Sequence, residues 1–238
     1  MAILSLDHVH AYYGKAHILQ GVSLEVERSS VVGIFGRNGA GKTTLLRTIM
    51  NLVPRAEGTI RFGNRDLTGL TADARTRTGI VYMSQDLRIF PDLTVRENCM
   101  AARQAVRSSI SFDDVLGHIP ELTPHLDRPA GKLSGGQQQL VGFARSLLMG
   151  SDLFMLDEPT EGLMPLLVKR VGEIVRALKQ RSITVLLVEQ NVQLGMSVCD
   201  RIYFLEKGRI IDQATPSEIQ AKHLIERYLG VSHRSSSM

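Results

Sequence analysis

A glycine-rich segment that follows a short apolar run constrains this chain more than any other feature. Residues 36 to 43 read Gly-Arg-Asn-Gly-Ala-Gly-Lys-Thr and fit the pattern G-x-x-x-x-G-K-[ST], and an apolar run at 31–35 precedes them. The apolar run predicts a buried strand, and residues 44–50 predict a helix. Backbone N–H groups of such a turn can point at phosphate oxygens. Because strand, turn, lysine, hydroxyl and helix occur in the required order, we interpret the segment as a phosphate-binding loop rather than a glycine-rich turn with a chance lysine.

This loop supplies residues that are expected to hold a nucleotide and its metal ion. Lys42 would reach the β- and γ-phosphates, and the Thr43 hydroxyl would ligate Mg²⁺. The loop residues that we expect to bind the nucleotide are Gly36, Asn38, Gly39, Ala40, Gly41, Lys42, Thr43 and Thr44.

Composition and charge disfavour several other classes of protein. With 238 residues, 43% of them hydrophobic, the chain can form one large domain or two closely joined ones. Cys99 and Cys199 stand far apart, which argues against a zinc site or a disulfide framework and indicates a reducing cytoplasm. Apolar stretches such as 185–188 are strand-sized, so we expect no membrane span, and Asp7 interrupts any signal peptide. The net charge of +4 comes from scattered arginines, so we expect no nucleic-acid partner.

The order of the predicted elements indicates an α/β fold. Strands are expected at 3–10, 18–27, 58–62, 79–84, 153–156, 183–188 and 201–205, and helices near 166–180 and 191–198, with a mainly helical stretch at 89–150. Alternating strands and helices imply a mostly parallel sheet with right-handed crossovers. We therefore expect one domain over 1–238, in which 1–88 and 151–238 form the nucleotide-binding core with an antiparallel β edge at the N-terminus. Residues 89–150 are expected to form an inserted helical subdomain.

Two carboxylates end one of the predicted parallel strands. The apolar run 153–156 leads directly into Asp157 and Glu158. A carboxylate at this end of a parallel strand lies beside a phosphate loop, where Asp157 can hold Mg²⁺ directly or through water. Glu158 can then polarise an attacking water. A solvated strand end is the alternative, and the phosphate loop elsewhere in the chain disfavours it.

A second anion site is indicated at the start of a helical run. Residues 133 to 137 read Leu-Ser-Gly-Gly-Gln and open the run 138–149. Ser134 can cap the helix, and Gly135 and Gly136 expose backbone N–H groups at its positive end. A capped surface helix explains the same residues, but a second phosphate-seeking helix end is informative in a chain that already has a phosphate loop.

Taken together, these motifs make the chain resemble the nucleotide-binding subunit of an ATP-binding-cassette (ABC) transporter over nearly its whole length. Residues 36–44 resemble the Walker A loop, 153–158 the Walker B strand with its catalytic glutamate, and 133–137 the signature motif. The resemblance implies ATP and Mg²⁺ as ligands. It implies catalytic roles for Glu158, Lys42 and Gln190, and ATP contacts from Ser134, Gly135, Gly136 and Gln137.

The resemblance also assigns roles to two single residues. Tyr13 stands where the family places an aromatic residue that stacks on adenine, although Tyr12 could exchange roles with it. Gln85 matches the glutamine loop, which in the family contacts Mg²⁺ and water beside the membrane partner. The implied metal-site residues are therefore Thr43, Gln85 and Asp157.

Two positions depart from the commonest family pattern. Met164 stands where many cassettes have the aspartate of the D-loop, and Gln190 stands where most have the switch histidine. Glutamine can still donate a side-chain N–H to a γ-phosphate, but it cannot become cationic near neutral pH. The contact that the histidine would make is therefore kept without its charge.

Partners and location are also implied by the resemblance. Two cassettes are expected to pair head to tail, identical or related, so that each signature helix caps the ATP held by the other chain. The pair is expected to bind transmembrane permease subunits at the cytoplasmic face of the inner (plasma) membrane, with a solute-binding protein acting indirectly.

Four segments narrow the resemblance to the LivF-type ATPase of branched-chain amino-acid importers. They are 12–15, 187–191, 200–210 and 228–230. Glu161-Gly162 is similar to a related type that serves urea and short-chain amides, which leaves that solute class open. An exporter ATPase is disfavoured only by these segments. A soluble cassette ATPase acting on ribosomes or DNA is disfavoured because the chain has neither a second cassette nor a long coiled-coil insertion.

Overall fold

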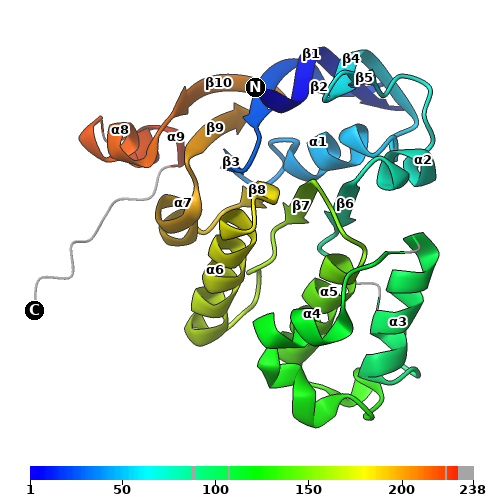
Figure 1. Ribbon diagram of the computed structural model, residues 1–238. Helices are drawn as coiled ribbons and strands as arrows, with labels where there is room; N and C mark the ends of the chain where they lie inside the picture. The colour runs from blue at the N-terminus through cyan, green and yellow to red at the C-terminus, as the bar shows by residue number, and fades with distance from the viewer. Residues whose placement is uncertain (87–88, 107, 223, 230–238) are drawn as a thin grey trace, which may run out of the picture.

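The computed structural model describes residues 1–86, 89–106, 108–222 and 224–229, so Gly230 of the segment 228–230 lies outside it (Figure 1). These residues form two sheets and a set of helices. The strands are β1 (Ala2–Tyr13), β2 (Ala16–Glu27), β3 (Val31–Phe35), β4 (Arg55–Phe62), β5 (Arg65–Asp66), β6 (Ile80–Met83), β7 (Leu153–Asp157), β8 (Thr184–Glu189), β9 (Arg201–Glu206) and β10 (Arg209–Ala214). The α-helices are α1 (Lys42–Ile49), α2 (Ala72–Arg77), α3 (Val95–Val106), α4 (Phe112–His118), α5 (Gly135–Leu148), α6 (Pro165–Gln180), α7 (Val192–Val198), α8 (Pro216–Ala221) and α9 (Leu224–Leu229), with 3-10 helices η1 (Pro120–His125) and η2 (Ala130–Lys132).

The larger sheet has the order β10-β9-β3-β8-β7-β6 and is parallel apart from β10. Every residue of β3, β7 and β8 is buried, as expected for parallel strands covered on both faces. The predicted α/β fold with a mostly parallel sheet is confirmed. β10 is not predicted from the sequence, because its six residues give only a short and irregular pattern of apolar and polar positions.

The antiparallel strands at the N-terminus form a sheet of their own, with the order β2-β1-β4-β5. β1 pairs antiparallel with both β2 and β4, and buried and exposed residues alternate along much of β2. A strand with one solvated face fits an antiparallel sheet that is covered on one side, rather than the edge of a sheet covered on both. The predicted antiparallel β part is confirmed, and it packs over the large sheet instead of extending it.

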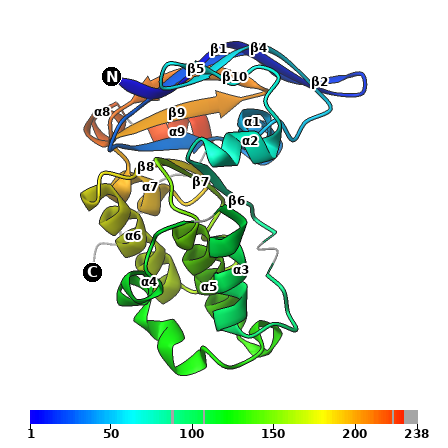
Figure 2. The same cartoon turned by 45° about the vertical axis from the view of Figure 1, so that its right-hand side comes forward.

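Two hydrophobic cores lie on the two faces of the large sheet, and β8 contributes to both. Val185 and Leu187 belong to the core shared with α5, α6 and α7, whereas Leu186 and Val188 belong to the core shared with α1 and the antiparallel sheet. Successive strand residues point to opposite faces, which explains this division. Figure 2 shows these layers, with the antiparallel sheet above the large sheet and α3 to α6 below it.

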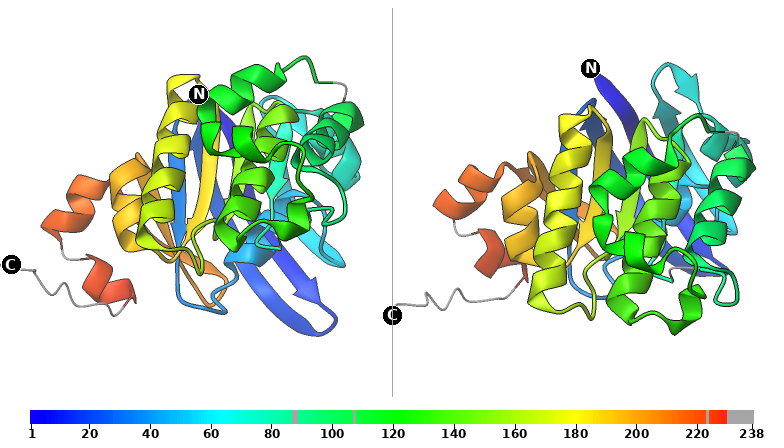
Figure 3. Two further views of the ribbon diagram at one scale, coloured as in Figure 1. Left: turned by 90° about the horizontal axis from the view of Figure 1, so that it is seen from below. Right: turned by 60° about the horizontal axis from the view of Figure 1, so that its bottom comes forward.

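The helices of the predicted middle segment gather beside α6 on one side of the large sheet (Figure 3). α3 and α4 both pack on α5. Arg170 connects α6 to α4 and η1, because its guanidinium donates to Glu121 Oε1 at 2.5 Å and to the His118 carbonyl. α5 starts three residues earlier than the expected run at 138. No helix of the described residues is long and apolar enough to cross a membrane.

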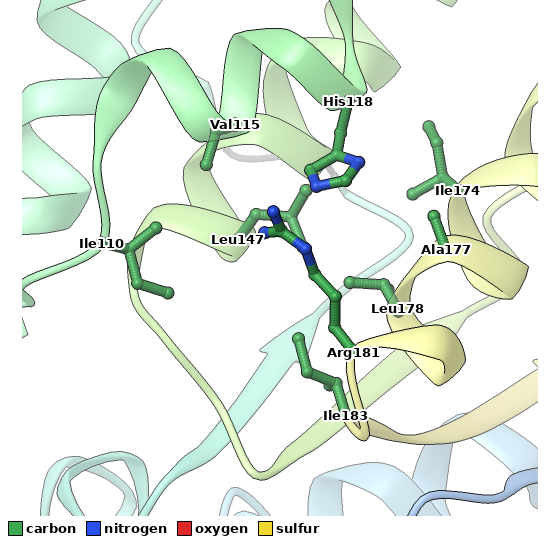
Figure 4. Close-up of a pocket in the computed structure, with 9 residues that line it drawn as sticks. All are labelled: Ile110, Val115, His118, Leu147, Ile174, Ala177, Leu178, Arg181 and Ile183. Carbon is green, nitrogen blue, oxygen red and sulfur yellow. The ribbon is translucent and has the colours of Figure 1, made fainter.

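A small cavity of about 30 Å³ lies where α4, α5 and α6 meet (Figure 4). Its lining is mostly apolar, and the polar side chains of His118 and Arg181 point into it. Burial lowers the pKa of His118, with the Arg181 charge acting in the same direction. The cavity has room for water molecules but not for a nucleotide. It contains no residue of the phosphate loop, so it is not the nucleotide site.

Candidate nucleotide-binding site

The phosphate loop joins β3 to α1 in a conformation that only glycine adopts easily. Gly39 has φ 77° and Gly41 has φ 108°, and Gly41 directly precedes the first residue of α1. Both values lie in the left-handed region that disfavours residues with a Cβ. Gly36 has no space for a side chain, because an added Cβ would lie 2.3 Å from the Leu205 carbonyl oxygen. The three glycines of the motif are therefore needed for the turn itself.

The turn between β9 and β10 holds this loop against β2. The Gly208 N–H donates to the Ala40 carbonyl at 2.9 Å, and the Gly208 carbonyl accepts from the Gln20 N–H at 2.8 Å. A Cβ on Gly208, whose φ is 76°, would lie 1.9 Å from the Ile18 carbonyl oxygen. This support is not predicted from the sequence, where its only signal is a Lys-Gly pair between two apolar runs.

Lys42 is buried and already paired inside the site. Its amine donates to the Gly36 carbonyl at 2.9 Å and lies 3.0 Å from Glu158 Oε1. Glu158 follows β7 with φ 47°, a left-handed backbone for a residue with a Cβ, and its N–H donates to the Val188 carbonyl at 2.9 Å. Such strained residues cluster at functional sites. The structure therefore brings together the lysine and the glutamate that the sequence predicted.

Two of the three predicted metal ligands, Thr43 and Asp157, also meet. Thr43 Oγ1 donates to Asp157 Oδ1 at 3.0 Å, and Tyr82 of β6 donates to Asp157 Oδ2 at 2.8 Å. Burial raises the pKa of Asp157, and the hydrogen bonds from Tyr82 and Thr43 oppose this shift. A hydroxyl and a carboxylate are the ligand types that Mg²⁺ prefers, so the residues present fit this ion. Tyr82 was missed because nothing in a strand sequence shows which carboxylate on the next strand it will meet.

Gln190 lies on the other side of the Glu158 carboxylate from Lys42. Its side-chain Nε2 donates to Glu158 Oε2 at 2.8 Å, while Lys42 approaches Oε1. Gln190 comes directly after β8, the neighbour of β7 in the sheet. The ends of adjacent parallel strands thus bring the three expected catalytic side chains into one cluster.

Other predicted residues lie outside this cluster. The Gln85 side chain donates to Glu161 and not to Asp157. Tyr12 stacks on His17 at 4.4 Å between ring centroids, and the Arg55 guanidinium lies 4.6 Å from the Tyr12 ring. Tyr13 is 36% exposed, and its hydrogen bond with Arg47 of α1 raises the pKa of Arg47. Of the two tyrosines, Tyr13 is therefore the one beside the phosphate-loop helix.

The signature segment begins α5, and Ser134 and Gln137 form a capping box at the start of that helix. Ser134 Oγ accepts from the Gln137 N–H at 3.4 Å, and Gln137 Oε1 accepts from the Ser134 N–H at 3.0 Å, so the predicted N-cap is confirmed. A Cβ on Gly136 would lie 2.1 Å from Leu167 Cδ1 of α6. α5 and α1 lie on opposite sides of the large sheet (Figure 1). Among the described residues, no hydrogen bond joins 134–137 to the phosphate loop.

Met164 also has a defined place. It directly precedes Pro165, the first residue of α6, and caps the helix without a side-chain hydrogen bond. Its side chain is 68% exposed, and the neighbouring Leu166 is 76% exposed. An aspartate at this position would supply the cap that methionine lacks.

Comparison with known proteins agrees with this arrangement. Residues 19–161 match the ABC transporter family. The chain is 36% identical to the high-affinity branched-chain amino acid transport ATP-binding protein BraG of Pseudomonas aeruginosa, over 96% of this chain and 100% of that protein. It is 35% identical to the lipopolysaccharide export system ATP-binding protein LptB of Escherichia coli K12, over 98% of this chain and 100% of that protein.

A solved structure shows the same fold. It is the ADP conformation of an ATP-binding cassette of an ABC transporter, with a TM-score of 0.86 and 28% identity over 97% of this chain and 98% of that one. The fold and the family that the sequence indicates are therefore confirmed. With its phosphate loop, its strand-end carboxylates and its close match to these relatives, the chain belongs to the ABC transporter family as an ATP-hydrolysing cassette.

Proposed function

We propose that this chain energises an importer for branched-chain amino acids by binding and hydrolysing ATP. The observation that carries the catalytic part is the Glu158 carboxylate, which lies between the Lys42 amine and the Gln190 amide beside the phosphate loop. The similarity to BraG and to the probable branched-chain amino acid transport protein LivF of Archaeoglobus fulgidus supports the solute class.

In this proposal the phosphate loop binds the nucleotide and the strand ends prepare the water. Backbone N–H groups of 39–44 and the Lys42 amine would bind the phosphates, and Thr43 and Asp157 would hold Mg²⁺, with Gln85 at the edge of that site. Bound Mg²⁺ supplies positive charge against the β- and γ-phosphate oxygens. Tyr13 would stack on the adenine.

Lys42 has to exchange partners when phosphate arrives. Its charge is now balanced by Glu158 at 3.0 Å, and phosphate oxygens would compete for the same amine. Once Lys42 turns to phosphate, the Glu158 carboxylate is free to accept a proton from, and so orient, the attacking water. Gln190 would then donate to Glu158 or to the γ-phosphate as a neutral group.

The site of one chain is incomplete in this proposal. Ser134, Gly135, Gly136 and Gln137 of a second cassette would close over the ATP bound at Lys42 of the first, because the signature segment lies across the sheet from its own phosphate loop. The closed pair would act on permease subunits at the cytoplasmic face of the membrane, and a solute-binding protein would determine the solute indirectly.

Uptake by cells tests this function. A strain that lacks the gene should lose uptake of labelled leucine, the wild-type gene should restore it, and Glu158→Gln should not. Lys179→Ala, which removes an ion-paired lysine beside Asp200 and outside the site, should restore uptake like wild type. Unchanged leucine uptake in the deletion strain would contradict the solute class.

Two alternatives have specific support. The similarity to LptB supports export of a lipid-like cargo, and Glu161-Gly162 supports uptake of urea or short-chain amides. Loss of labelled urea or acetamide uptake with normal leucine uptake would favour the amide importer, whereas a changed cell-envelope lipid composition would favour the exporter.

A further inference from the structure

Glu189, the last residue of β8, is a buried carboxylate to which the proposed mechanism assigns no role. It is 2% exposed, and among the described residues only Asp157 is an equally buried acid. Burial of a carboxylate is costly unless hydrogen bonds compensate for the lost water. Burial accordingly raises the pKa of Glu189, and the hydrogen bonds around it oppose this shift.

The hydrogen bonds of Glu189 join two loops. Oε1 accepts from the Thr160 N–H at 3.1 Å and from the Thr160 hydroxyl at 2.6 Å. Oε2 accepts from the Gln190 N–H at 2.9 Å and from the Asn191 N–H at 3.0 Å. Thr160 belongs to the loop after β7 that begins with Glu158, and Gln190 begins the loop after β8. One side chain therefore fastens the two loops that carry the proposed water-orienting pair.

The chemistry of these partners requires an acceptor on both oxygens. Three of the four donors are backbone N–H groups, which cannot accept a hydrogen bond. The ionised carboxylate accepts at both oxygens. A glutamine at this position has the same shape but one acceptor, so its NH₂ would face either the Thr160 N–H or the N–H groups of Gln190 and Asn191.

We propose that Glu189 is a positioning residue for ATP hydrolysis, which holds the loops after β7 and β8 together so that the Gln190 amide meets the Glu158 carboxylate. Glu189 does not touch the nucleotide in this inference. It acts through the 2.8 Å contact between Gln190 Nε2 and Glu158 Oε2. The inference rests on the proposed catalytic roles of Glu158 and Gln190.

Glu189→Gln in the purified full-length chain is the first test. We expect kcat to fall by about 10- to 100-fold, as for a small misplacement of a catalytic group, while KM for ATP stays within about twofold. The matched control is Asp200→Asn, because Asp200 also accepts from a backbone N–H, that of Val31 at 2.9 Å, but lies away from the two loops. Asp200→Asn should lower the melting temperature without lowering kcat per folded molecule.

A double-mutant cycle separates positioning from simple destabilisation. If Glu189 acts through Gln190, the variant Glu189→Gln/Gln190→Ala should lose less activity than the product of the two single losses. A loss equal to that product would show independent action and would overturn the inference, as would a wild-type kcat in Glu189→Gln.

Thr160 provides a second route if Glu189→Gln does not fold. Thr160→Val removes the hydroxyl that donates to Glu189 and should lower kcat, whereas Thr160→Ser keeps the hydroxyl and should retain it. Equal kcat in the valine and serine variants would overturn the inference.

Glu158→Gln distinguishes failure of the proposed function from failure of the inference about Glu189. An active Glu158→Gln contradicts the proposed mechanism, whereas an inactive Glu158→Gln with an active Glu189→Gln contradicts only the positioning role.

Discussion

At the scale of single residues, the proposed function makes the Lys42–Glu158 pair the link between nucleotide binding and the release of the Glu158 carboxylate. Both side chains are largely buried, and their charged atoms are 3.0 Å apart. In the proposed mechanism phosphate displaces Glu158 from Lys42, so part of the attraction between lysine and phosphate is offset by the loss of this pair. The Glu158 carboxylate would then keep its hydrogen bond with Gln190.

Glu158→Gln should therefore lower hydrolysis and strengthen binding. We expect turnover to fall by about two orders of magnitude, because water loses its proton acceptor. We expect the affinity for ATP to rise, because the neutral amide competes less with phosphate for Lys42. Turnover assays and equilibrium ATP binding check both. Lys42→Ala should instead weaken ATP binding, and near-normal turnover in Glu158→Gln would contradict the role of Glu158.

The hydrogen bond from Tyr82 to Asp157 predicts a pH effect. Burial holds the pKa of Asp157 above its ordinary value, and the Tyr82 hydroxyl lowers it. Tyr82→Phe should therefore raise this pKa further, so that Asp157 becomes protonated at a higher pH and Mg²⁺ binding weakens there. As the pH is lowered, the apparent Mg²⁺ affinity in ATPase assays should begin to decline at a higher pH in Tyr82→Phe than in wild type. At alkaline pH the affinities of the two proteins should be equal.

The raised pKa of Asp157 also determines how its contribution to the stability of the fold changes with pH. A carboxylate whose pKa is raised in the folded state lowers the stability of the fold at pH values above that pKa. This loss of stability disappears as the pH falls through the raised pKa toward the ordinary value.

Tyr203→Phe is the matched control for Tyr82→Phe, because the Tyr203 hydroxyl donates to the Glu25 carbonyl at 3.0 Å, outside the proposed metal site. Coinciding Mg²⁺ curves for wild type and Tyr82→Phe would show that Tyr82 does not act on Asp157.

At the scale of elements, the helix ends differ in how well they are capped. α5 begins with the capping box of Ser134 and Gln137, and Asn191 Oδ1 caps α7 by accepting from the Leu194 N–H at 3.0 Å. α6 begins after Met164, whose side chain accepts no hydrogen bond. Met164, which stands where the family pattern has an aspartate, therefore stabilises the start of α6 less than an aspartate would.

Met164→Asp should stabilise the chain. Met164 has the extended backbone of a helix cap, with φ −66° and ψ 151°, so an aspartate side chain can accept from the first N–H groups of α6. The expected gain is about 0.5–2 kcal/mol in the free energy of unfolding, measured by denaturant titration. Met164→Ala, which lacks the acceptor, is the control, and equal stability of the two variants would refute the capping explanation.

At the scale of the whole molecule, the phosphate loop and the signature segment are separated by the large sheet. They belong to different cores, α1 to the one shared with the antiparallel sheet and α5 to the other. Because α1 and α5 lie on opposite faces of the large sheet, Ser134 does not face Lys42 of the same chain. In the proposed closed site, Ser134 therefore comes from a second cassette.

Turnover should for this reason depend on protein concentration. The isolated chain should be a monomer or weak dimer with slow ATPase activity, and activity per chain should rise with concentration or on addition of partner subunits. Turnover measured over a dilution series, with sedimentation at the same concentrations, checks this. Constant turnover per chain in samples that remain monomeric would argue against a shared site.

Much of the fold could be predicted because its signals are local. The phosphate loop depends on glycines at fixed spacing, and the buried strands on short apolar runs such as 153–156. The Ser134 cap depends on a residue three positions along the chain. α2 and β10 were missed because their patterns are short and their stability comes from packing.

The sequence by itself determined the phosphate loop, the strand-end carboxylates and the family, since each is written in the spacing of neighbouring residues. The roles of the individual site residues, Tyr13 and Gln85 among them, remain predictions. Only the tertiary structure decided which distant residues meet: the Tyr82 hydroxyl at Asp157, the Gly208 N–H at the Ala40 carbonyl, and the Glu189 carboxylate between the loops of Glu158 and Gln190. These contacts depend on strand order and register in the sheet, which bring residues more than 25 positions apart within hydrogen-bonding distance and leave no mark in the local sequence.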